Sequence, residues 1–326
     1  MLFLRLIKII GFLLLFVTIQ ITAQNATEVD NIIKKYPKSF LNPEQLASKI
    51  QKDFNTEYSK ARAIYTWMAI NMTYDVKAYL NPPKMKIIKY KDEYELERKE
   101  QEIKTKTINK AFNKRRAVCN GFSLLFNHLA SLVGLKSEVI EGASKTSNYD
   151  IGKKRISVSH AWNSVQIDGV MHLVDVTWGC GYYNPDTQKF KNEFNSFYFD
   201  TPPGLFFEKH YPKSGMWEND IIDKEQFLNA SLIYLDNPEI NYKILEPKSG
   251  VIEVKENQII NFKIQNLSRF ESLFYSLKSG KTKEIKSNDE KDNVLNFEIC
   301  FDKNIGKYLT LYVSGKAIVT YKIKLE

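Results

Sequence analysis

The Asp168-Gly169 dipeptide is the feature that most constrains the fold of this 326-residue chain. It stands between two apolar-rich runs, "RISVSHAWNSVQI" and "VMHLVDVTW". Asp-Gly between two such runs is a strong signal of a two-residue β-hairpin turn, because both turn positions require positive φ. The dipeptide therefore predicts an antiparallel pair in which Ile167 faces Val170, and this pairing fixes the register of the whole hairpin.

The predicted register brings a histidine and a carboxylate onto one face of the hairpin. His160 is expected to face Thr177, which makes Asp175 its diagonal neighbour on the same face. Diagonal neighbours in an antiparallel pair lie roughly 7–8 Å apart at Cα, so their side chains can meet. His172 faces Val165 and points to the opposite face. The pattern thus selects His160 as the partner of Asp175, and a turn one residue longer would undo the pairing.

A cysteine precedes another apolar run, "NKRRAVCNGFSLLFNHLASLVGL". Cys119 is expected to begin a helix that Gly134 ends, with Gly121 keeping the approach to the thiol uncrowded. At a helix N-terminus the macrodipole favours the thiolate, and the outward N–H groups can hold an oxyanion. A buried, inert cysteine is the equally weighted alternative. The apolar positions expected to face the core are Leu124, Leu125, Leu129, Leu132 and Val133.

Together these residues have the types needed for nucleophilic catalysis. Cys119 would attack, His160 would act as the base, and Asp175 would orient the imidazole. Each also has a structural interpretation, such as a satisfied strand histidine or an aspartate bonded to a backbone N–H. We expect no metal and no cofactor, since the spacing of these residues matches none of the zinc patterns.

The first residues predict export. Arg5 and Lys8 precede an apolar run from Ile9 to Ile21, and small residues and a polar segment follow. This order indicates a signal peptide over residues 1–24 and a secreted or periplasmic protein, with an uncleaved anchor as the alternative. No later run is long enough to cross a bilayer, so we expect no stable membrane insertion after cleavage.

Charge and cysteine content narrow the partners. The formal net charge of +9 is spread thinly along the chain, which favours a solvated lysine-rich surface and no nucleic-acid partner. In an exported protein cysteines usually pair, and three of them leave at least one thiol unpaired. Cys180 with Cys300 is a candidate pair, which would leave Cys119 as the unpaired thiol.

The remaining pattern predicts two folded domains after the signal peptide, over residues 25–222 and 240–326. In the first, we expect helices near 43–54 and 57–71, an exposed and partly helical excursion over 84–116 and a strand at "SEVIEG". A short helix near "DKEQFLNAS" is expected to close this part of the chain. From about Tyr242 apolar and polar residues alternate in short runs, which indicates an immunoglobulin-like antiparallel β-sandwich of roughly 80–100 residues.

Two long segments resemble a known family. "AVCNGFSLLFNHLASLVGL" followed by "SHAWNSVQIDGVMHLVDVTWGCGYYN" is similar to the transglutaminase-like superfamily, and the closer branch is the kyphoscoliosis-peptidase-like proteins. "KARAIYTWMAINMTYD" and "FYFDTPPGLFFEKHYPKSGMWE" also resemble this branch, so the likeness covers roughly residues 42–217.

The resemblance implies an α+β fold, in which a papain/transglutaminase-like core packs a cysteine helix against an antiparallel sheet. It implies Cys119 as nucleophile, His160 as base and Asp175 as orienter, and an aromatic residue, Trp67 or Tyr74, that assists the oxyanion. Cys180 departs from the small residue expected there, and suggests a second thiol near the site or a disulfide with Cys119. The excursion over 84–116 is also longer than expected.

The predicted function is that of an exported cysteine-dependent amide hydrolase or acyltransferase, peptidase or transglutaminase-like. It would act on a protein or peptide substrate through a thioester at Cys119. Whether water or an amine takes the acyl group does not follow from the residues. The alternative is a non-catalytic transglutaminase-like module for binding or assembly.

Overall fold

The computed structural model describes residues 26–82, 88–184, 187–234, 242–267, 271–278, 281–285, 288–302 and 306–326. The predicted signal peptide lies outside these residues. In the described part of the chain, no helix has both the length and the apolar character needed to span a membrane. Two compact units form, one from residues up to 139 together with 161–201, the other from 140–160 together with 202–326. The domain limits expected from the sequence stay predictions.

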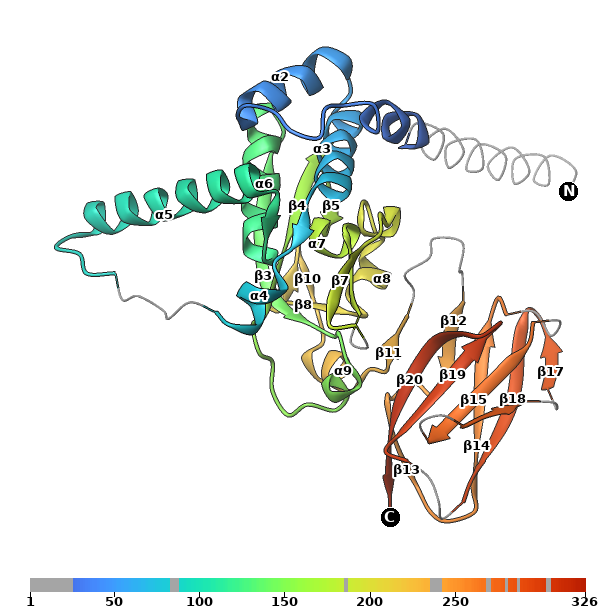
Figure 1. Ribbon diagram of the computed structural model, residues 1–326. Helices are drawn as coiled ribbons and strands as arrows, with labels where there is room; N and C mark the ends of the chain where they lie inside the picture. Colours follow the sequence, from blue (N-terminus) through green and yellow to red (C-terminus); the bar gives the residue numbers. More distant parts are fainter. Residues whose placement is uncertain are drawn as a thin grey trace, which may run out of the picture. The chain divides into compact units, whose positions relative to one another are not determined.

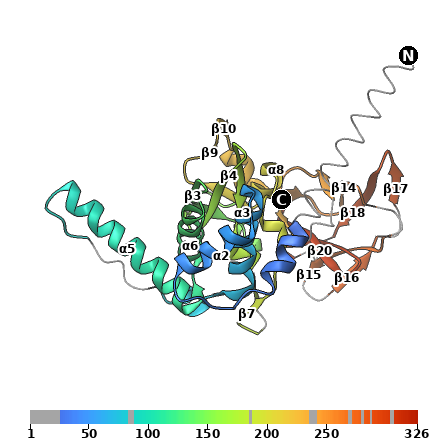
Figure 2. The same cartoon turned by 90° about the horizontal axis from the view of Figure 1, so that it is seen from above.

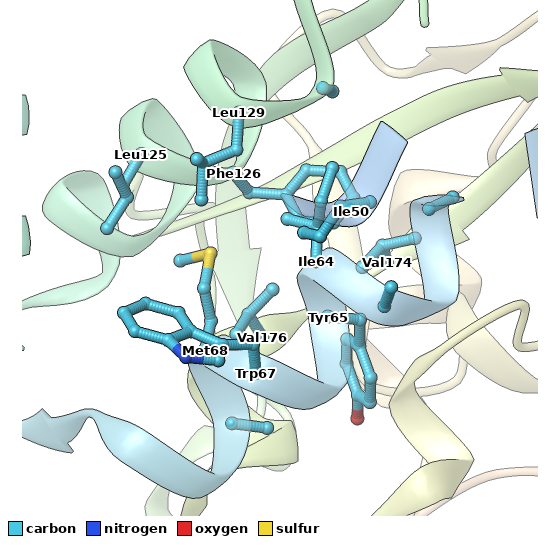
Figure 3. Packing of buried hydrophobic residues seen from close by; sticks show 14 of the residues in the cluster. Ile50, Ile64, Tyr65, Trp67, Met68, Leu125, Phe126, Leu129, Val174 and Val176 are labelled. Atoms are coloured by element: carbon cyan, nitrogen blue, oxygen red, sulfur yellow. The ribbon is translucent and has the colours of Figure 1, made fainter. Parts of the chain in front are cut away.

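Three helices build the core of the first unit: α2 (Pro43–Asp53), α3 (Glu57–Asn71) and α6 (Cys119–Leu132). Local chemistry starts two of them, since the side chains of Asn42 and Thr56 accept N–H groups from the first turns of α2 and α3. Both helices are confirmed. Side chains of all three helices meet those of Val174 and Val176 in one apolar cluster (Figure 3).

A buried ion pair fixes α3 to the helical residues 26–33. Arg62 lies within the packed face of α3, and its Nε and Nη2 donate to the two carboxylate oxygens of Asp30 at 2.9 and 2.6 Å. The hydroxyl of Thr66 donates to the same carboxylate at 2.6 Å. A buried charge needs such a partner, because its desolvation would otherwise be costly.

The helix α5 (Glu93–Lys114) extends away from the other helices of the first unit (Figures 1 and 2). Asp92 caps its first turn, and only Ala111 and Phe112, near its C-terminal end, are buried. The predicted exposed, partly helical excursion is therefore confirmed for the described residues from 88 onward.

The predicted hairpin forms with the predicted register. Strands β4 (His160–Ile167) and β5 (Val170–Val174) pair from Ile167 with Val170 to Asn163 with Val174. Asp168 and Gly169 have φ of 50° and 86°, as the turn requires. With β3 (Ser137–Ser144) and β8 (His210–Pro212) they form a sheet of order β5-β4-β3-β8.

The ladder is shorter than predicted at its open end. The expected pairing of His160 with Thr177 is wrong, because β5 ends at Val174 and Asp175 begins the short helix α7 (Val176–Gly179). The carboxylate of Asp175 accepts the N–H of Trp178 at 3.1 Å. An aspartate offers the backbone this local bond in place of a strand ladder, and here the cap wins.

The second unit contains the predicted sandwich. One sheet has the order β12-β14-β18-β17, and the other β11-β20-β19-β15-β16, with β13 parallel to β20. The rings of Phe262 (β14) and Tyr321 (β20) lie 5.6 Å apart and join the two sheets. The α+β fold class is thus confirmed. The strands are β11 (Leu232–Ile233), β12 (Lys243–Glu246), β13 (Val251–Val254), β14 (Gln258–Gln265), β15 (Leu273–Lys278), β16 (Lys281–Glu284), β17 (Asn288–Lys291), β18 (Val294–Phe301), β19 (Tyr308–Val313) and β20 (Lys316–Leu325).

Short elements complete the chain, and the predicted helix near 223–231 is among them. They are β1 (Thr73–Tyr74), α4 (Val76–Leu80), β2 (Arg116–Ala117), η1 (Asn148–Asp150), β6 (Gly181–Asn184), β7 (Lys189–Asn192), η2 (Ser196–Tyr198), α8 (Pro203–Phe206), β9 (Met216–Trp217), β10 (Asp220–Ile221) and α9 (Lys224–Asn229).

Candidate active site

Cys119 is the first residue of α6, as expected, and is partly exposed. The preceding residue, Val118, is the N-cap and provides no side-chain hydrogen bond to the first turn. The first N–H groups of the helix therefore have no capping side chain, which suits a transient anion. Further along, Ser123 Oγ donates to the carbonyl of Cys119 at 3.0 Å and steadies this turn.

Gly121 has a different role from the expected one. It is buried, and a Cβ added there would lie 2.6 Å from the Cβ of Ala117 and 3.6 Å from that of Ala111. The missing side chain therefore lets α6 approach β2 and α5 closely. The expectation that Gly121 keeps the approach to the thiol open is wrong.

The face of α6 that meets the core also differs in detail from the expected one. Leu125, Leu129 and Val133 are buried as predicted, and Leu132 packs partly against the core. Leu124 is only partly buried. Two aromatic residues that the pattern did not single out, Phe122 and Phe126, are fully buried and contribute more apolar area than a leucine would.

Asn163 ties the cysteine helix to the hairpin. Its side-chain amide donates to the carbonyl of Ser123 in α6 and to that of Glu138 in β3, both at 3.1 Å. The side chain is 1% exposed, so water cannot replace these bonds. One amide thus fixes α6, β3 and β4 to one another.

The structure brings His160 and Asp175 together in a buried group that also contains His210. One ligand atom from each of the three side chains lies within 4.8 Å of the other two. Asp175 is held by its bond to the α7 turn and by its own N–H, which donates to Tyr198 O at 2.8 Å. Although the predicted strand pairing fails, the cap at α7 still delivers the carboxylate to the histidine.

His172 lies elsewhere, as the register predicts. Its Nδ1 is 2.6 Å from Oδ1 of Asp200, and this partner raises the pKa of the imidazole above its ordinary value. The structure therefore separates the two histidines of the hairpin into two different carboxylate pairs.

A model of the transglutaminase-like superfamily matches residues 44–178. Over these residues the chain is similar to the transglutaminase-like superfamily. The resemblance stated from the motifs is confirmed, and the domain carries Cys119, His160 and Asp175 in the order expected for it.

The curated relatives that this chain matches are much longer proteins. Kyphoscoliosis peptidase of Homo sapiens is 29% identical over 203 residues, which are 58% of this chain and 28% of that protein. The same peptidase of Mus musculus is 30% identical over 209 residues, 60% of this chain and 28% of that protein. The chain thus spans less than a third of their length. A solved structure described as a TGase is 19% identical, covers 49% of this chain and 38% of that chain, and has a TM-score of 0.30.

Of the two aromatic residues expected to assist the oxyanion, Tyr74 is the one that lies near Cys119. Tyr74 in β1 pairs with Ala117, two residues before Cys119. Burial raises the pKa of its hydroxyl, and the negative charges of Cys119 and Asp175 raise it further. Trp67 is instead committed to the core, where its indole N–H donates to Pro37 O at 3.0 Å.

Cys180 is neither a second reactive thiol nor half of a disulfide. It is fully buried, its thiol donates to Thr177 O at 3.1 Å, and burial raises its pKa. All three cysteines are free, so the expected pair with Cys300 and the suggested pair with Cys119 are both wrong. A buried neutral thiol is a poor nucleophile, which leaves Cys119 as the reactive candidate inside the transglutaminase-like domain.

His210 is the member of the buried group that sequence reasoning missed. Two imidazoles and a carboxylate are ligands that a divalent ion such as zinc accepts, so the group could hold one. No sequence spacing could show this, because the three residues come from β4, the start of α7 and β8. Only the "EKHYP" segment, within the stretch that resembles the kyphoscoliosis-peptidase-like proteins, points to His210.

Proposed function

We propose that the chain is an exported cysteine-dependent amide hydrolase or acyltransferase that acts on a protein or peptide. The observation that carries the proposal is the buried contact group of His160 and Asp175, in a chain whose partly exposed Cys119 begins a helix without a capping side chain. These are the residue types and environments of a nucleophile, a base and an orienting carboxylate.

In the proposed reaction the Cys119 thiolate attacks the carbonyl carbon of an amide. The N–H groups at the start of α6, with Tyr74, hold the resulting oxyanion. The C–N bond then breaks, the His160 imidazolium gives its proton to the leaving amine, and the acyl group stays on the sulfur as a thioester. Asp175 keeps the imidazole oriented and stabilises its charged form.

The second half of the reaction restores the thiol. Water or an amine attacks the thioester, His160 takes the proton of the attacking group, and the Cys119 sulfur leaves. The name peptidase, carried by the relatives in human and mouse, favours water as the acceptor. Mass spectrometry of a protein substrate, with and without an added amine, separates cleavage, deamidation and cross-linking.

Alkylation by iodoacetamide tests the nucleophile without knowledge of the substrate. The chain has two internal standards, the buried Cys180 and the exposed Cys300. We expect Cys119 to react faster than Cys300, and His160→Ala to slow it about a hundredfold or more, which is what a general base contributes. His172→Ala is the matched control, since that residue pairs with Asp200 instead.

The alternative function predicts a different result. If Cys119 alkylates no faster than Cys300, and His160→Ala leaves its rate unchanged, the catalytic proposal is wrong. The chain would then be better explained as a non-catalytic module for binding or assembly.

A further inference from the structure

His210 and His160 approach each other through their attachment to the same strand. His210 begins β8, which pairs with β3, so that His210 lies opposite Ser144. Ser159, the residue before His160, donates its N–H to the carbonyl of Gly142 in β3 at 2.9 Å. Backbone pairing with the end of β3 therefore holds the two segments that carry the histidines, β8 and the residue before His160, beside each other.

The imidazole of His210 is clamped in one orientation. Its ring stacks on that of Phe206, with centroids 3.9 Å apart and an interplanar angle of 15°. Its Nδ1 is 3.1 Å from the carbonyl oxygen of Phe206, and since a carbonyl can only accept, Nδ1 donates. This bond fixes the tautomer, so the neutral ring carries its lone pair on Nε2. The side chain is 1% exposed.

The clamped ring lies directly beside the proposed base. The centroids of His210 and His160 are 5.6 Å apart with a tilt of 39°, and His160 is 8% exposed. The two rings each bring a nitrogen within 4.8 Å of the other. His160 is thus bordered by a second imidazole whose tautomer and plane are already determined.

We propose that His210 is a positioning residue for His160, and that its Nε2 edge, held in place by Phe206, sets the orientation of the His160 ring. The inference rests on the proposed function, in which His160 serves Cys119. An orienting group behind a catalytic imidazole acts by fixing which nitrogen faces the reaction, so its loss changes reactivity more than stability.

Two substitutions whose side chains differ in length test this role in the complete protein. His210→Gln carries an amide oxygen that reaches the position of Nε2 and accepts a hydrogen bond as its lone pair does, whereas His210→Asn is too short to reach it. We expect His210→Asn to slow alkylation of Cys119 about tenfold, a fraction of what a general base contributes, and His210→Gln to stay close to the unmodified protein. Thermal unfolding of both variants shows whether stability differs between them.

The second readout is the ¹⁵N spectrum of the His160 ring in histidine-labelled protein, which does not depend on catalysis. We expect its ring shifts to move in His210→Asn, to stay in His210→Gln, and to stay in the control His172→Asn. If the His160 shifts and the alkylation rate are the same in His210→Asn and the unmodified protein, the positioning role is wrong. If the shifts move while alkylation never depends on His160, the contact stands and the proposed function fails.

Discussion

At the scale of single residues, carboxylates decide what each histidine of the hairpin can do. His160 belongs to a fully buried group with Asp175, whereas His172 meets the partly exposed Asp200. Two histidines on the same strand pair thus lie in two different electrostatic environments. One pair lies where desolvation strengthens every charge interaction, and the other lies where water weakens it.

The exposed pair predicts a pH dependence of stability. The hydrogen bond that the His172 imidazole donates to Asp200 raises the pKa of His172 above its ordinary value of 6.5. The stabilisation is therefore complete below pH 6.5 and disappears as the pH rises through the raised value. Because the pair is partly exposed, its contribution is at most about 1 kcal/mol.

Urea unfolding over a range of pH measures this contribution. The unmodified protein should exceed Asp200→Asn in free energy of unfolding at low pH, and the two should converge at higher pH. Asp289→Asn, a substitution on β17, is a control that should show no such convergence. A constant difference between the unmodified protein and Asp200→Asn at all pH values would contradict the prediction.

At the scale of elements, the hairpin turn sets the register that keeps His160 and His172 on different faces. A Cβ at Gly169 would meet nothing within 4 Å, so the demand for glycine comes from its φ of 86° alone. Gly204 in α8 has equally open surroundings and no positive φ. Because neither position is crowded, comparing alanine substitutions at the two glycines isolates the cost of the positive φ at Gly169.

We therefore expect Gly169→Ala to lower the free energy of unfolding by about 1–2 kcal/mol, the cost of a left-handed non-glycine residue. Gly204→Ala should be neutral or slightly stabilising, because alanine reduces the freedom of the unfolded chain. Urea unfolding of both variants checks this. Equal effects from the two substitutions would mean that the turn tolerates a side chain at Gly169.

The elements also show how far sequence patterns reach. The Asp168-Gly169 turn was predictable because its chemistry is local, and the caps at Asn42 and Thr56 are local too. The sequence pattern predicts Asp175 as a strand residue, whereas the structure places it at the N-cap of α7. Whether such an aspartate pairs in a strand or caps a helix depends on the conformation of the residues that follow it.

Longer-range contacts escaped prediction for a related reason. The packing role of Gly121 depends on Ala111 and Ala117, which belong to α5 and β2, and His210 joins His160 only through the pairing of β8 with β3. No periodicity within one segment encodes such meetings. The family resemblance supplied the site residues, but not the residues that hold them.

At the scale of the whole molecule, the second unit is assembled from two separate stretches of chain, and Lys145 joins them. Its Nζ donates to the carbonyl of Ala230 at 2.6 Å and lies 4.9 Å from the centre of the Phe227 ring. Burial lowers the pKa of this lysine to about 8. A second bond, from Lys322 Nζ to Ile151 O, links the same early stretch to β20.

Lys145→Met should lower the free energy of unfolding by about 1–3 kcal/mol, because the Ala230 carbonyl loses its buried donor. The lowered pKa means that the folded state disfavours the charged lysine, so the stability of the unmodified protein increases as pH rises from about 8 toward 10.5. The advantage over Lys145→Met should therefore grow across that range.

Urea unfolding at several pH values above neutrality measures the effect. Lys248→Met, an exposed lysine in the same unit, is the control and should track the unmodified protein. If Lys145→Met and Lys248→Met behave alike at every pH, Lys145 does not bind the two stretches together.

The second unit is built from two stretches of chain that are separated in sequence. This limits which recombinant chains, made from two related proteins, can form the unit correctly. Residues 140–160 and 202–326 share one compact unit, although 161–201 lie between them in sequence. A crossover within that interval would give a chimera one parent's His160 and the other parent's His210, with β3 from one lineage and β8 from another. Exchange of the second unit between relatives therefore keeps both stretches from one parent only if the breakpoint lies before residue 140, and a later breakpoint needs parents whose two stretches have stayed compatible.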